Sequence, residues 1–136
     1  MGTELPRLSD LRKTWIIDID GIIFPHNEYL TTPEETPLPY VLDFFSHIHP
    51  DDRVILLSAR KQEYLERTRT NLDRWGIRYD ELILGLPVGE RILINDIKPD
   101  GLKTAYAVNL RRNEGLAGVS SIVQGNRSAN MVESNC

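Results

Sequence analysis

WIIDIDGII, residues 15–23, is the stretch that decides the predicted fold. Four of its first five residues are large and apolar, and Asp20 with Gly21 end the run. An apolar run bounded by a turn signal is typical of a buried central strand. Asp18 and Asp20 fall at the carboxyl end of this strand, where the Gly lets the backbone turn sharply. Such a strand end indicates a cation or phosphate site, although Asp and Gly are also common in ordinary turns.

The composition predicts one soluble globular domain. The chain has 136 residues, of which 40% are hydrophobic and 26% are charged. The net charge of -4 gives no reason to expect nucleic-acid binding through a basic face. Cys136 is the one cysteine, so neither a disulfide framework nor a cysteine-based metal site is expected. No stretch has the pattern of a signal peptide or a membrane span, and we expect a cytoplasmic protein.

Strand and helix patterns alternate along the rest of the chain. Further strands are predicted at residues 53–57, 82–84 and 91–94, with 104–110 as a candidate fifth. Apolar spacing predicts a helix over residues 41–48 and a clearer amphipathic helix over 61–75. This alternation predicts an α/β fold, in which a three-layer, Rossmann-like parallel sheet carries helices on both faces.

The chain divides into three predicted segments. Residues 1–13 form a polar lead-in, and residues 14–117 form the folded domain. Residues 118–136, rich in Ser, Asn and Gly, are expected to form a flexible tail, although residues 119–123 are apolar enough for an edge strand.

Polar side chains follow three of the predicted strands. Ser58 and Arg60 follow the second strand, and Asp96 and Asp100 follow the fourth. Parallel sheets bind ligands at the carboxyl ends of their strands, so we expect these side chains to meet the two acids of the first strand. Three carboxylates at one point repel each other unless a cation lies between them. Oxygen ligands without a Cys or His cluster favour Mg²⁺.

The residues after the second strand suit an anion. The Ser58 hydroxyl and the backbone N–H groups around Ala59 lie just before a predicted helix, and Arg60 can donate forked hydrogen bonds to phosphate. Lys98 lies in the loop beside Asp96 and is a further cation within reach. The sequence therefore predicts phosphate contacts from Ser58, Ala59, Arg60 and Lys98.

These motifs resemble the haloacid dehalogenase superfamily of phosphohydrolases. DIDG at residues 18–21, then Ser58, then Asn95-Asp96 with Asp100 are similar to its motif order, over about residues 14–116. Ser58-Ala59-Arg60 before an amphipathic helix resembles polynucleotide 3'-phosphatase domains and small members found near polysaccharide-biosynthesis enzymes. The resemblance extends to small, uncapped members, because residues 21–36 (the flap) and 85–90 are too short for a cap domain.

The resemblance implies a Mg²⁺-dependent phosphomonoester hydrolase that works through an aspartyl-phosphate. Asp18 would be the nucleophile and Asp20 the general acid/base. Ser58 would bind the transferring phosphoryl group. Asp18, Asp20 and Asp96 would hold Mg²⁺, and Asn95 and Asp100 would support them.

One departure weakens that expectation. The superfamily's lysine lies before a Pro in small members, and Leu86 occupies that place here. Arg60 or Lys98 is expected to replace it, whereas Arg91 begins a predicted strand, at the wrong end of the sheet. Without such a cation, the alternative is a weak or inactive module that binds a phosphorylated ligand or partner. A receiver-like signalling domain is disfavoured, because no acceptor Asp follows a middle strand.

An uncapped site is open to a bulky phosphorylated partner. Sugar phosphates, nucleic-acid ends and phosphoproteins all qualify, and no membrane partner is expected. A second copy of the chain could instead cover the open site, so a homo-oligomer is a further expectation. In the flap, His26, Asn27 and Tyr29 are candidate substrate contacts, although solvated loop residues are the simpler interpretation.

Overall fold

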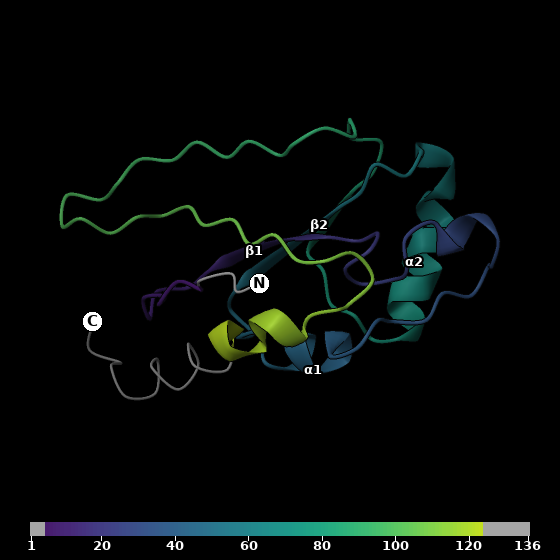
Figure 1. Ribbon diagram of the computed structural model, residues 1–136, viewed down its shortest axis with the longest axis horizontal. Coiled ribbons are helices and arrows are strands. Elements are labelled where there is room, and N and C mark those ends of the chain that lie inside the picture. Colours follow the sequence, from purple (N-terminus) through teal and green to yellow (C-terminus); the bar gives the residue numbers. More distant parts are fainter. Residues whose placement is uncertain (1–4, 124–136) are drawn as a thin grey trace.

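A parallel three-stranded sheet forms the centre of the structure, a computed structural model that describes residues 5–123. Its strand order is β1-β2-β3, and the strands are β1 (Thr14–Asp18), β2 (Arg53–Leu57) and β3 (Glu81–Ile83). Asp18 is paired with Leu57, and Leu57 with Ile83, so the three strands end at the same edge (Figure 1). The predicted α/β class and the first three strands are confirmed to within one residue at each end.

Two short α-helices and two 3-10 turns connect the strands, and a third 3-10 turn follows β3. The helices are α1 (Val41–Ser46) and α2 (Leu65–Arg74), and the turns are η1 (Glu28–Leu30), η2 (Gln62–Tyr64) and η3 (Ala117–Val119). On α2 the buried residues Thr68, Asn71 and Leu72 recur at helical spacing, as the amphipathic pattern predicts. Gly76 follows with a φ of 67°, a left-handed conformation that suits glycine and ends the helix.

Among residues 5–123, the helices cover one face of the sheet. Ile17, Val54 and Leu56 are buried in one apolar cluster with residues of both helices. Trp15 packs edge-on against Phe44, with 5.6 Å between their ring centres. The alternate residues point to the other face, where Ile16 is 49% exposed and Ile83 39% exposed. No helix of residues 5–123 covers that face, unlike the three-layer arrangement predicted, because both helices and the helical residues 117–123 pack into the same apolar cluster on the first face.

Residues 85–107 leave the sheet as a long arm (Figure 1). The strand predicted at 91–94 is not formed, and the one bridge in the arm joins Ile97 to Lys103. Residues 104–110 are not a strand either. The fourth-strand prediction is wrong here because residues 85–90 are few, whereas a parallel crossover needs about a dozen residues.

The chain returns to the core after the arm. Val108 and Leu110 pack against the apolar cluster, and Leu116 donates a backbone hydrogen bond to the Pro39 carbonyl. Residues 117–123 are helical and bury Val119 and Val123, in place of the tail or edge strand predicted there. Residues 124–136, the rest of that predicted tail, lie outside the described residues. In residues 5–123 we find no helix with the length and apolarity needed to cross a membrane.

Candidate active site

A tight turn holds the two acids of β1 at the edge of the sheet. β1 ends at Asp18, and the buried Ile19 continues the ladder by donating to the Leu57 carbonyl at 3.1 Å. The backbone N–H of Gly21 donates to Phe24 at 2.7 Å, and Gly21 has a φ of 84°, which only glycine adopts readily. The turn predicted from Asp20-Gly21 is therefore present, and it places both carboxylates at the strand ends.

Asp20 is bound by the residues that follow β2. The Ser58 hydroxyl donates to Asp20 Oδ2 at 2.8 Å and accepts the backbone N–H of Arg60 at 2.9 Å. The Arg60 guanidinium reaches Asp20 Oδ1 through Nε at 3.1 Å and Nη2 at 3.0 Å. Ala59 lies between the two residues in the same turn. The sheet thus brings Asp18, Asp20 and Ser58-Ala59-Arg60 to one edge, as the sequence predicts.

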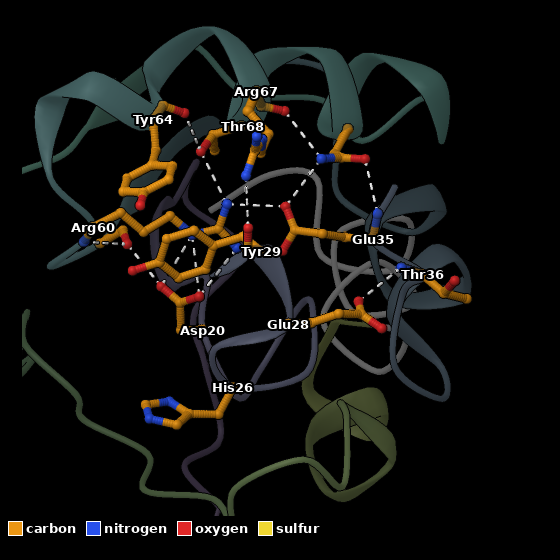
Figure 2. Close-up of polar contacts among 12 residues, drawn as sticks. Asp20, His26, Glu28, Tyr29, Glu35, Thr36, Arg60, Tyr64, Arg67 and Thr68 are labelled. Carbon is orange, nitrogen blue, oxygen red and sulfur yellow. Dashed lines mark hydrogen bonds and ion pairs between the residues drawn. The ribbon is translucent and has the colours of Figure 1, made fainter. Parts of the chain in front are cut away.

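Arg60 also binds a second carboxylate, which the sequence did not indicate. Its guanidinium contacts Glu35 Oε1 at 2.5 Å and Oε2 at 3.0 Å, donates to Thr68 Oγ1 at 2.9 Å, and lies 4.1 Å from the Tyr29 ring centre. Figure 2 shows the guanidinium between the Asp20 and Glu35 carboxylates. Arg60 and Glu35 are each 1% exposed. In this arrangement the guanidinium is a buried bridge, and its donors already have protein partners.

Glu35 is the site-linked residue that sequence reasoning missed. Asn71 donates to Glu35 Oε2 at 3.0 Å and accepts the Glu35 backbone N–H at 2.9 Å, while Trp75 donates to the Glu35 carbonyl at 2.8 Å. A lone Glu in a Pro-rich loop carries no motif. The one available signal was the pair of polar residues, Thr68 and Asn71, on the buried face of a predicted helix.

The pKa of the Asp18 carboxyl is raised above its ordinary value of 3.8. The largest cause of this rise is desolvation, because the surrounding protein removes part of the hydration of the carboxyl group. The residue as a whole is nevertheless exposed. The charge of Asp20 raises the pKa further, whereas Arg91 and His26 lower it. Arg91, which the sequence argument set aside, is therefore the arginine whose charge most favours ionised Asp18.

The residues predicted after the fourth strand are not at this edge. Asn95 donates to the Thr104 carbonyl, Thr104 donates to the Asp96 carbonyl, and Asp100 accepts the Leu102 backbone N–H. All of these contacts stay within the arm, whose tip lies on the side of the molecule opposite the strand ends (Figure 1). Lys98 lies in the same arm, inside the turn closed by the bridge between Ile97 and Lys103. The predicted cluster of polar side chains is therefore not formed as a whole, because Asn95, Asp96, Lys98 and Asp100 lie in the arm and not at the strand ends.

Two of the three acids predicted to bind Mg²⁺, Asp18 and Asp20, lie at the same strand end. Among residues 5–123, no group of three His, Cys, Asp or Glu side chains is arranged to hold a metal ion. Asp18 and Asp20 nevertheless lie close enough for the charge of Asp20 to raise the pKa of Asp18. Mg²⁺ commonly uses one or two carboxylates and completes its shell with water and substrate phosphate. The Asp18 carboxylate fits such a shared site, whereas both Asp20 carboxylate oxygens already accept from Ser58 and Arg60, and Asp96 is not a ligand in this conformation.

Comparison with known proteins identifies no relative of established function. No protein-family model matches the chain, and no curated protein matches it. Among solved structures, a crystallographic target from Vibrio cholerae is similar, with 17% sequence identity and a TM-score of 0.49. The similarity covers 89% of this chain and 98% of that one. Similarity of this degree identifies neither a family nor an activity.

Proposed function

We propose that the protein is a Mg²⁺-dependent phosphomonoester hydrolase of the haloacid dehalogenase type, with Asp18 as its nucleophile. The observation that carries this proposal is the meeting of Asp18, Asp20 and Ser58 at one sheet edge, with Ser58 Oγ 2.8 Å from the Asp20 carboxylate. A strand end with two acids, a glycine turn and a hydroxyl from the next strand is suited to phosphoryl transfer.

The chemistry follows from the positions of the two acids. The Asp18 carboxylate attacks phosphorus, and the bond to the leaving oxygen breaks as Asp20 supplies it with a proton. Asp20 then takes a proton from water, which attacks the aspartyl-phosphate and releases phosphate and free Asp18. Ser58 and Arg60 hold the Asp20 carboxylate in one orientation for both steps. Mg²⁺, held by Asp18 and Asp20, would neutralise charge on the phosphoryl oxygens.

Several finer expectations belong to this proposal. Asp96, Asp100 and Lys98 would act once the arm reaches the strand ends, and a Rossmann-like sheet covered on both faces would then be complete. The absence of a helical cap in residues 5–123 supports a bulky phosphorylated substrate, such as a sugar phosphate, nucleic-acid end or phosphoprotein. A cytoplasmic location remains a prediction.

The test is hydrolysis of an aryl phosphate and a panel of sugar phosphates, with Mg²⁺ and with a chelator. We expect Mg²⁺-dependent turnover that falls by more than about 100-fold in Asp18→Asn, because the nucleophile is lost. Asp51→Asn, which removes an exposed carboxylate in the turn before β2, is the matched control and should keep full activity. Turnover that survives Asp18→Asn would reject Asp18 as the nucleophile.

A second candidate is a module that binds a phosphorylated ligand without turnover. The observation that favours it is that Asp20 already occupies both the Ser58 hydroxyl and the Arg60 guanidinium, while Leu86 stands where a lysine is expected. Calorimetric binding of a phosphorylated sugar without hydrolysis, retained in Asp18→Asn, would favour the module over the enzyme.

A further inference from the structure

We infer that two copies of the chain exchange their arms. Residues 91–94 of one copy would pair in parallel with the free edge of β1 in the other, and Asp96 of the first would join Asp18 of the second. The role given to Asp96 rests on the proposed function, whereas the exchange itself rests on the geometry of the arm and the sheet.

The arm exposes large apolar side chains that a folded chain normally buries. Val88 is 91% exposed, Ile92 78%, Leu93 54%, Ile94 86% and Ile97 61%. Contiguous apolar exposure of this kind marks an interaction surface. The run from Ile92 to Ile94 also contains two β-branched isoleucines, which favour strands, so a strand edge is a suitable partner.

β1 offers such an edge. Its backbone is paired with β2 on one side, and among the described residues none donates to or accepts from its other side. The returning chain packs against the core through Val108 and Leu110, but forms no backbone hydrogen bond with β1. An unpaired edge strand is a template for an added strand from another molecule.

The arm runs in the wrong direction to add to its own sheet in parallel. It leaves from the side where the strands end, and its first half runs back toward the side where they begin (Figure 1). Residues 85–90 are too few to reverse this direction. A two-fold axis perpendicular to β1 reverses the direction of β1 in the second copy, so the same arm lies parallel to that strand.

A second copy is the occupant that these features favour. The chain carries both an apolar arm and an unpaired edge, and a reciprocal exchange satisfies both in a closed dimer. Burying five such side chains from each copy, with the surfaces that receive them, is on the scale of a standard interface of roughly 1,600 Å². Lys98 and Lys103 at the arm tip complement the acidic pair at the strand ends.

The exchange would complete the site across the interface. In a parallel pair, residues that follow the added strand lie beside residues that follow β1. Asn95 and Asp96 come directly after residues 91–94, so Asp96 would reach the edge that holds the partner's acids. A third carboxylate there would add an oxygen ligand for a hard cation. The cation would in turn relieve the repulsion among the three negative charges.

Analytical ultracentrifugation of the full chain tests the exchange. We expect the wild type to sediment as a dimer at micromolar concentration, and Ile92→Asp/Ile94→Asp to sediment as a monomer with an unchanged circular dichroism spectrum. Leu42→Asp, an exposed apolar position on α1, is the control and should remain dimeric. A monomeric wild type, or a dimer that survives the double substitution, would overturn the exchange.

Mixing two inactive variants tests the shared site. Asp18→Asn and Asp96→Asn, refolded together, form mixed dimers in which one of the two sites has both carboxylates. Activity should return to about a quarter of the wild-type value, because half of the dimers are mixed. No recovery in a mixed dimer would overturn the sharing of Asp96. If the wild type hydrolyses no substrate, the proposed function fails, and sedimentation still decides the exchange.

Discussion

At the scale of single residues, Arg60 connects the candidate site to the core. Its guanidinium contacts Asp20 at the strand ends and the buried Glu35 in the flap. The pKa of Arg60 is raised because hydrogen bonds and charge from Glu35 and Asp20 outweigh the cost of its burial. The orientation of the predicted acid/base, Asp20, therefore depends on a residue that is packed like part of the core.

Removing the guanidinium should destabilise the protein strongly. Arg60→Met leaves Glu35 buried without its cation, so we expect the free energy of unfolding to fall by about 3–5 kcal/mol, measured by urea denaturation. Arg60→Met/Glu35→Leu should recover part of the loss, because no charge is then buried alone. Arg69→Met, which breaks an exposed pair with Glu66, should cost at most about 1 kcal/mol. Equal losses in the two single variants would contradict this account.

The raised pKa of Asp18 predicts how stability depends on pH. A carboxyl whose folded pKa lies above its ordinary 3.8 binds its proton more tightly in the folded state, so its contribution to stability is lost as pH rises through the folded pKa. Asp18→Asn should therefore be more stable than the wild type at pH 7, and the difference should shrink toward pH 3.8. Urea unfolding between pH 4 and 8 measures it. If Asp18→Asn is less stable than the wild type at pH 7, the predicted direction of the pH dependence is wrong.

Arg91 should tune that titration. Its charge lowers the pKa of Asp18, so Arg91→Gln should raise the pKa of the Asp18 carboxyl further. The carboxyl carbon chemical shift of Asp18, followed by NMR against pH, reports this directly. Arg53→Gln, which removes an exposed pair with Glu81 at the start of β2, is the matched control and should leave the titration unchanged.

At the scale of elements, α2 holds the flap in place through Asn71. Its side chain accepts the Glu35 N–H at 2.9 Å and donates to the Pro33 carbonyl and Glu35 Oε2, both at 3.0 Å. Arg67 adds a bond from α2 to the Tyr29 carbonyl at 2.8 Å. Tyr29, a candidate substrate contact, is thereby buried against Arg60 and Tyr64.

Loosening this contact should release the flap. Asn71→Ala leaves buried backbone and carboxylate groups without partners, and we expect it to cost about 1–3 kcal/mol of stability. Amide exchange at Glu35 should accelerate more than exchange in β1 or β2. Thr70→Ala, on the exposed side of the same helix, is the control and should change neither quantity. Uniform acceleration across the sheet would show that the effect is global and not confined to the flap.

At the scale of the whole molecule, the sheet and the arm are both incomplete. One sheet face exposes Ile16 and Ile83, and the arm exposes further apolar side chains. If two copies complete each other, association stabilises the folded state by mass action. The thermal midpoint of the wild type should then rise with protein concentration, and that of Ile92→Asp/Ile94→Asp should not. Calorimetry at several concentrations measures both, and a concentration-independent wild type would count against association.

The sequence by itself determined the local features of this protein. The apolar run before Asp18, the Asp20-Gly21 turn and the amphipathic pattern over residues 61–75 each depend on neighbours in the chain. For that reason the first three strands, the main helix and the gathering of the two acids with Ser58 and Arg60 could be predicted. Strand ends in a parallel sheet share one edge, whatever the packing elsewhere.

Only the tertiary structure decided where distant segments lie. Residues 91–94 have the composition of a strand. Whether they pair depends on the preceding connection, which must bring them to a sheet edge in the right direction. Residues 85–90 are too few to do so. Arg60 has the chemistry of a phosphate ligand, but Glu35, 25 positions away in the chain, binds it in the core. Long-range pairing and burial of charge depend on three-dimensional packing, which no local pattern encodes.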